Sequence, residues 1–126
     1  MAGCRGRVLV VDEDPIWRLA LDRQLELLGW DVVTLNTGEE AIRVVERGFI
    51  VDVLLTELRL PDLDGRQVAW AISRLLPPVR LAFMTVGPAR EPLEPAAAPL
   101  LLKPFTTQAL DNAVEGAVAW DAPPLW

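Results

Sequence analysis

Five side chains with ion-binding chemistry stand at the ends of four apolar runs of this chain. Carboxylate and hydroxyl oxygens are the hard ligands that divalent cations, Mg²⁺ above all, prefer in proteins, and an amine can balance their charge. Open parallel sheets place their ligands at the carboxyl ends of the strands. The spacing therefore predicts one acidic pocket formed by Asp12, Glu13, Glu57, Thr85 and Lys103.

The acidic turn at residues 12–14 indicates which kind of ion would bind. A nucleotide-binding protein of this architecture would need glycines and backbone donors here, because a phosphate is an anion. Adjacent carboxylates would repel it and suit a cation. We assign Asp12 and Glu13 to the pocket, with a solvated Glu13 as the alternative, and Asp14 to the cap of the following helix.

Short apolar runs alternate with longer amphipathic segments, which is typical of a parallel sheet covered by helices on both faces. Strands are predicted at about 7–12, 31–35, 52–57, 79–84 and 100–102. A first helix is predicted at 15–28, followed by Gly29, and a second runs from the capping pattern at 37–40 to Gly48. A third begins at Asp64-Gly65 and ends before Pro77-Pro78. The last begins at Thr106 or Thr107 and has on one side Leu110, Val114, Ala117 and Val118.

Residues 87–99 break this alternation. They hold four prolines where a fourth helix should lie, and a proline inside a helix costs about 3 kcal/mol. At most one or two helical turns are expected in this segment.

Four motifs together resemble the receiver domain of two-component response regulators. They are VLVVDEDP at 8–15, DVLLTELRLPDLDG at 52–65, LAFMT at 81–85 and LLLKPF at 100–105. The resemblance covers nearly the whole chain. It implies an α/β, flavodoxin-like (βα)5 sandwich with strand order 2-1-3-4-5, here with a shortened or missing fourth helix.

The resemblance also implies roles for single residues. The position of Glu57 is an aspartate in the family and accepts a phosphoryl group, and the position of Glu13 is usually an aspartate that touches the metal. The backbone carbonyl at Arg59 would complete the metal site. The Thr85 hydroxyl and Lys103 would contact the phosphoryl group, and the peptide bond before Pro104 would be cis. Leu100 stands where the family usually has an aromatic switch residue.

Glutamate at position 57 alters the chemical centre of such a site. Its extra C–C bond of about 1.5 Å moves the carboxylate toward the metal, and misplacements near 1 Å can cost about a hundredfold in rate. We therefore expect a receiver without phosphorylation control, in which Mg²⁺ binding is weak or absent and Lys103 pairs with Glu57 or Asp12.

Composition limits the remaining alternatives. The chain has 126 residues, 52% of them hydrophobic, which suits a single domain over 1–126 with flexible or covering tails at 1–6 and 121–126. A net charge of −6 argues against binding nucleic acid. One cysteine, Cys4, cannot form an internal disulfide, and no apolar run could span a membrane, so a cytoplasmic protein is expected.

The function expected from these features is that of a stand-alone, atypical receiver in a phosphorelay, acting by contact with a histidine kinase or a downstream signalling protein and not as an enzyme. A homodimer is an open alternative. So are a working phosphoacceptor, an adaptor with a vestigial pocket, and a flavodoxin-like flavin protein. Trp120 and Trp126 flank Pro123-Pro124, and this tail is expected to fold over the face without its helix or to meet a partner.

Overall fold

A computed structural model describes residues 4–87 and 93–120 of the chain. Its sheet has the order β2-β1-β3-β4-β5, all parallel, and β6 pairs antiparallel with β4. The predicted strand order is therefore confirmed. The strands are β1 (Arg7–Val11), β2 (Asp31–Leu35), β3 (Val53–Glu57), β4 (Arg80–Val86), β5 (Leu100–Lys103) and β6 (Val118–Ala119).

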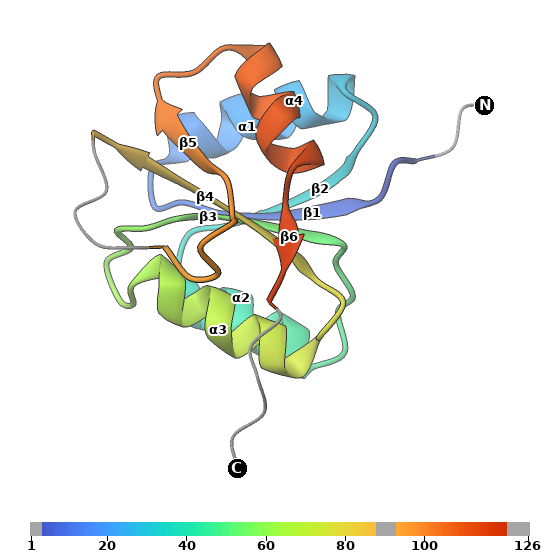
Figure 1. Ribbon diagram of the computed structural model, residues 1–126, viewed down its shortest axis with the longest axis vertical. Helices are drawn as coiled ribbons and strands as arrows, with labels where there is room; N and C mark the ends of the chain where they lie inside the picture. Colours follow the sequence, from blue (N-terminus) through green and yellow to red (C-terminus); the bar gives the residue numbers. More distant parts are fainter. Residues whose placement is uncertain (1–3, 88–92, 121–126) are drawn as a thin grey trace.

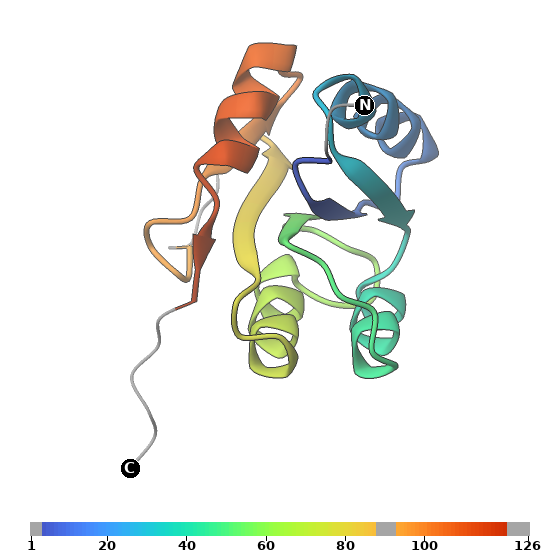
Figure 2. The same cartoon turned by 90° about the vertical axis from the view of Figure 1, so that its right-hand side faces the viewer.

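Helices cover the two faces of the sheet (Figures 1 and 2). One face carries α1 (Pro15–Leu27) and α4 (Thr107–Glu115), and the other carries α2 (Gly38–Glu46) and α3 (Gly65–Leu75). The core is correspondingly divided into two clusters. Val10, Leu55 and Met84 point toward α1 and α4, whereas Leu9, Leu54 and Phe83 point toward α2 and α3, because side chains alternate along a strand.

The helix boundaries follow from local capping chemistry. Asp14 caps α1 by accepting a hydrogen bond from the Ile16 amide, and Gly29 leaves this helix with a φ of +95°. Asp64 and Gln67 form a capping box at the start of α3. These caps were predicted for α1 and, at Asp64-Gly65, for α3, so both helices begin where the sequence indicates.

The segment between β4 and β5 differs most from a regular alternating fold. Within its described part, residues 93–99, no helix is present. Strand β5 begins beside Phe83, which leaves the first residues of β4 without a parallel neighbour on that side. Strand β6 takes this place, with Val118 opposite Leu81 and Ala119 opposite Arg80.

The prediction that the last helix includes Val118 was therefore wrong. Helix α4 ends at Glu115, and Gly116 caps it. The unpaired edge of β4 offers backbone hydrogen bonds to the chain that follows, and these outweigh the helical spacing of Ala117 and Val118. Trp120 follows β6 and packs against the cluster under α2 and α3.

The predicted tails are only partly within the described residues. Residues 121–126, including Trp126, lie outside them, as do residues 1–3. Arg5 covers the Trp30 ring at 4.8 Å and donates a hydrogen bond of 2.9 Å to the Leu28 carbonyl. Across residues 4–87 and 93–120, every helix is too short or too polar to cross a membrane.

Candidate functional site

The acidic pocket is built around the ammonium group of Lys103. Its Nζ atom donates a hydrogen bond to Asp12 Oδ2 and another, of 2.9 Å, to Glu57 Oε1. The two carboxylates and the amine are all buried, with Asp12 1%, Glu57 6% and Lys103 7% exposed. The expected pairing of Lys103 is present, and it involves both acids at once.

Backbone amides hold the second oxygen of each carboxylate. Asp12 Oδ1 accepts a hydrogen bond of 3.0 Å from the Asp14 amide, and Glu57 Oε2 accepts one of 3.2 Å from the Arg59 amide. Each carboxylate thus has one oxygen on Lys103 and the other on the backbone. Buried carboxylates need such partners, because an unpaired charge away from water is costly.

Strand register explains why these three side chains meet. Glu57 lies opposite Met84, and Val86 lies opposite Lys103, so Glu57 and Lys103 point to the face that carries α1 and α4. Asp12 follows β1 on the same face, two residues after Val10.

Thr85 is not joined to this network. It is the residue after Met84, so strand alternation directs its side chain toward the opposite face from Glu57. Thr85 is buried, with 1% of its surface exposed. In the described ranges, the structure gives its hydroxyl no hydrogen bond to Asp12, Glu57 or Lys103.

Two other residues of the predicted metal set also lie apart. The side chain of Glu13 is exposed, so the structure places it in the solvated position that the sequence left as an alternative. Arg59 is exposed too, and it is its amide that faces the Glu57 carboxylate. The suggested metal-ligand role of the Arg59 carbonyl stays a prediction.

Sequence analysis missed two residues of α1 that support the pocket. Arg18 Nη1 donates to the carbonyls of Asp12, at 2.7 Å, and Glu13, at 2.9 Å, and so fixes the acidic turn. Lys103 Nζ lies 5.2 Å from the centre of the Trp17 ring, which in turn stacks on Phe105. The clue in the sequence was their position on the first turn of a helix that begins beside Asp12.

The loop after Glu57 is fastened to two neighbouring elements. The Asp62 carboxylate accepts hydrogen bonds from the amides of Gly38, at 3.1 Å, and Glu39, at 2.8 Å, at the start of α2. Burial raises the pKa of Asp62, but these amide hydrogen bonds outweigh burial, and the net result is a pKa below the ordinary value of 3.8.

The contact of Gly65 with the end of β3 fixes the same loop at its other end. The Gly65 amide donates a hydrogen bond of 2.8 Å to the Leu58 carbonyl. A Cβ atom on Gly65 would lie 2.2 Å from the Glu57 carbonyl oxygen. Only glycine allows this close approach of α3 to the strand that carries Glu57.

The family model described as the response regulator receiver domain matches residues 8–115. The chain belongs to this family. Receiver domains are modules of two-component signalling that interact with histidine kinases and other proteins and are generally not enzymes.

Individual relatives agree with this assignment. The chain is 30% identical over 120 residues to the transcriptional regulatory protein GlrR of Escherichia coli K12, with 92% of this chain but only 27% of GlrR covered. A response regulator receiver protein from Sinorhizobium medicae superposes with a TM-score of 0.78 at 26% identity, covering 86% of this chain and 90% of that one. A Burkholderia pseudomallei response regulator crystallised with a phosphorylated aspartic acid, a calcium ion and citrate shares the fold, with a TM-score of 0.72 at 22% identity over 86% of this chain and 65% of that one.

Two further residues that the resemblance singled out lie on or next to β5. The Lys103-Pro104 peptide bond is cis, as the resemblance implied. Leu100, at the switch position, packs against the cluster under α2 and α3. An aliphatic side chain at this place cannot exchange a polar hydroxyl between the core and the surface.

Receiver domains bind Mg²⁺ at the phosphorylation site. Mg²⁺ is usually bound in proteins through one or two carboxylates, and water molecules complete its coordination. In this pocket Lys103 Nζ occupies the point between Asp12 and Glu57, and Glu13 faces solvent. No group of three or more acidic, histidine or cysteine side chains in residues 4–87 and 93–120 is arranged to hold a metal ion. Mg²⁺ would therefore have to compete with Lys103 for Asp12 and Glu57.

Proposed function

We propose that this chain is a receiver domain that works without phosphorylation and signals by protein–protein contact in a fixed state. The observation that carries the proposal is the double contact of Lys103 with Asp12 and Glu57. In this arrangement the amine binds the two acids that would hold a metal ion if one were bound.

The geometry of Glu57 supports the loss of phosphoryl transfer. An acceptor carboxylate must present one oxygen in line with the donor's phosphorus while a cation neutralises the phosphoryl oxygens. Here Oε1 contacts Lys103 and Oε2 contacts the Arg59 amide. Each oxygen is therefore held by a hydrogen bond inside a buried site, so neither can turn freely toward a phosphoryl donor.

A fixed state follows from the same contacts. In phosphorylation-controlled receivers the central charge is added and removed, whereas the Glu57 carboxylate is a permanent part of this chain. Lys103 and the two backbone amides hold it in one place. The amount of complex between this domain and its partners would then depend on their concentrations.

Phosphoryl transfer tests the proposal directly. The full chain is incubated with Mg²⁺ and radiolabelled acetyl phosphate, beside a receiver that has aspartate at the matching position and serves as the positive control. We expect label on the control and none on this chain, because Lys103 and the Arg59 amide hold the Glu57 carboxylate in place. Label on the wild type that disappears in Glu57→Gln or in Asp12→Asn would show a working phosphoacceptor and overturn the proposal.

The response of Trp17 provides a second measurement. Beryllofluoride with Mg²⁺ is titrated into nitrogen-15-labelled protein, and the indole signal of Trp17 is followed because its ring lies 5.2 Å from Lys103 Nζ. We expect no movement. The indole of Trp70 lies on α3, on the opposite face of the sheet, and serves as the internal reference.

A further inference from the structure

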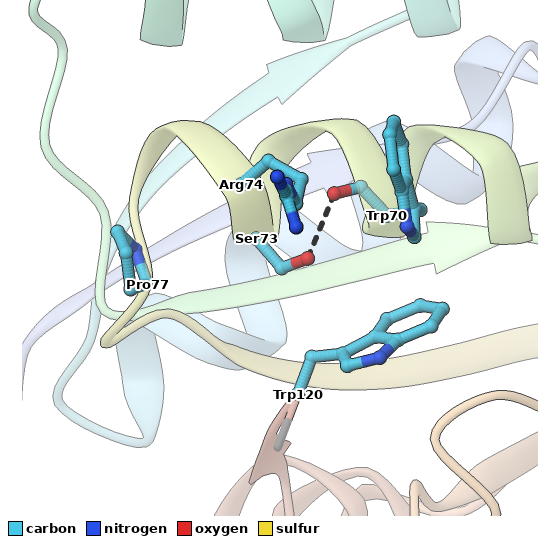
Figure 3. Close-up of a pocket in the computed structure, with 5 residues that line it drawn as sticks. All are labelled: Trp70, Ser73, Arg74, Pro77 and Trp120. Atoms are coloured by element: carbon cyan, nitrogen blue, oxygen red, sulfur yellow. Dashed lines mark hydrogen bonds between the residues drawn. The ribbon is translucent and has the colours of Figure 1, made fainter. Parts of the chain in front are cut away.

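A small aromatic cavity lies on the outer side of α3, where the fourth helix of a regular fold would pack. Figure 3 shows its lining residues, which we call the α3 slot: Trp70, Ser73, Arg74, Pro77 and Trp120. Its volume is about 250 Å³. This is below the usual range of about 300–1,000 Å³ for small-molecule sites, so the slot suits a few amino-acid side chains better than a cofactor.

The chemistry of the slot selects its occupant. Two indole rings, from α3 and from the end of β6, face the cavity, and Trp70 is 49% exposed. The Ser73 hydroxyl is already engaged, because it donates a hydrogen bond of 2.7 Å to the Trp70 carbonyl. Arg74 lies 5.5 Å from the centre of the Trp70 ring and brings the positive charge. An apolar segment with one acidic residue would complement this lining.

Proline-containing segments are well suited to such surfaces. They adopt an extended polyproline II conformation before binding, so they lose little conformational entropy, and they dock on grooves lined by aromatic rings. Residues 121–126, Asp-Ala-Pro-Pro-Leu-Trp, combine one acid, two prolines and two large apolar side chains. They follow directly after Trp120, which is itself part of the lining.

Length and tethering favour this segment over a separate partner. Six residues in a polyproline II conformation reach about 19 Å. Trp70 and Arg74 are four residues apart on α3 and so about 6 Å apart along its axis, so the segment can follow the slot even after a turn. A short tether also gives an effective concentration in the millimolar range.

We propose that residues 121–126 are the intramolecular ligand of the α3 slot, with Asp121 facing Arg74 and the proline and apolar residues on the indole rings. The segment would thereby cover the part of this face that borders the α3 slot. This inference does not depend on the proposed function, because Lys103 and Trp17 lie on the other side of the sheet.

Fluorine NMR of the full chain labelled with 5-fluorotryptophan tests the proposal. The chain contains five tryptophans, and each signal can be assigned by a Trp→Phe variant. We expect the Trp126 signal to lie away from its position in urea, and to move toward that position in Trp70→Ala. Trp70 is half-exposed, so the variant should fold; Arg74→Gln offers a second disruption with less loss of packing.

Control measurements distinguish residues 121–126 from other possible occupants of the slot. Trp17→Phe, on the opposite face, should leave the Trp126 signal unchanged. The Trp126 signal should also be independent of protein concentration, with a monomer by light scattering. A signal that moves on dilution would assign the slot to a second copy, and a Trp126 signal already at its position in urea would mean that the segment does not occupy the slot. Either result overturns the proposal.

Discussion

Lys103 keeps two carboxylates together in the interior of this domain. Without it, Asp12 and Glu57 would be buried as two like charges with only backbone amides as partners. Removing one partner of a buried ion pair destabilises a protein strongly, whereas the intact pair stabilises it little. The charge left behind can reach neither water nor a counter-charge. The pocket should therefore respond very differently to loss of the amine and loss of one acid.

Lys103→Met should lower the free energy of unfolding by about 3–5 kcal/mol, because it keeps an unbranched side chain but leaves two buried acids without their counter-charge. Glu57→Gln should change it by no more than about 1.5 kcal/mol, because a balanced pair of Asp12 and Lys103 is left. Denaturant unfolding of the two variants beside the wild type measures the difference. Equal losses would argue against Lys103 as the shared partner of both acids.

At the scale of elements, the loop between β3 and α3 determines where Glu57 stands. One end of the loop is held by the amide of Gly65 on the Leu58 carbonyl, and its middle is held by Asp62 on the first turn of α2. The loop thus transmits the packing of α2 and α3 to the carboxylate. Changes at either contact should reach the pocket although neither residue touches it.

Gly65→Ala should destabilise the fold by about 1–3 kcal/mol or more, because the added Cβ would collide with the Glu57 carbonyl. The Trp17 indole signal should shift as well, because β3 must move. Gly116→Ala is the matched control. Its Cβ would lie 3.0 Å from the nearest backbone atom, so a smaller loss and no shift of Trp17 are expected.

Asp62→Ala should lower the free energy of unfolding by about 1 kcal/mol near neutral pH, since it removes an acceptor from the start of α2. The pKa of Asp62 is lowered in the folded protein, so its contribution is complete above 3.8 and is lost as the pH falls through the folded pKa. The difference between wild type and Asp62→Ala should therefore shrink in acid. Asp62→Asn, which retains an acceptor, should cost less at neutral pH.

At the scale of the whole molecule, β6 closes the part of the β4 edge that β5 leaves open. It pairs with the first residues of β4, while β5 pairs with the later ones. The chain thereby brings Trp120 from the face of α4 to the face of α3. This crossing is what forms the α3 slot.

Val118→Gln should lower the free energy of unfolding by about 1–2 kcal/mol, because Val118 is half-buried against the cluster under α2 and α3. Leu27→Gln is the comparison variant. Leu27 is 88% exposed, so a change within about 0.5 kcal/mol is expected there. Hydrogen exchange at the start of β4 should accelerate only in Val118→Gln, and unchanged exchange would mean that β6 does not protect this edge.

Much of this domain could be predicted from local signals. Apolar runs and helix caps such as Asp14 and Asp64 act within a few residues of the chain. They were therefore enough to predict the strands and the helix starts, and the motifs at the strand ends predicted the family. The proline-rich segment also predicted the loss of a helix, and none is present in its described part, residues 93–99. The charged side chains at the strand ends predicted that Asp12, Glu57 and Lys103 lie in one pocket.

Tertiary structure alone decided which members of that set meet and what surrounds them. Strand register, a long-range property, directs Thr85 away from Glu57, and the path of the turn leaves Glu13 in solvent. Arg18 and Trp17 joined the site because α1 packs over it, and Val118 left its helical pattern for an unpaired strand edge. A residue's type shows what it can bind, whereas its partners depend on which segments the fold brings alongside.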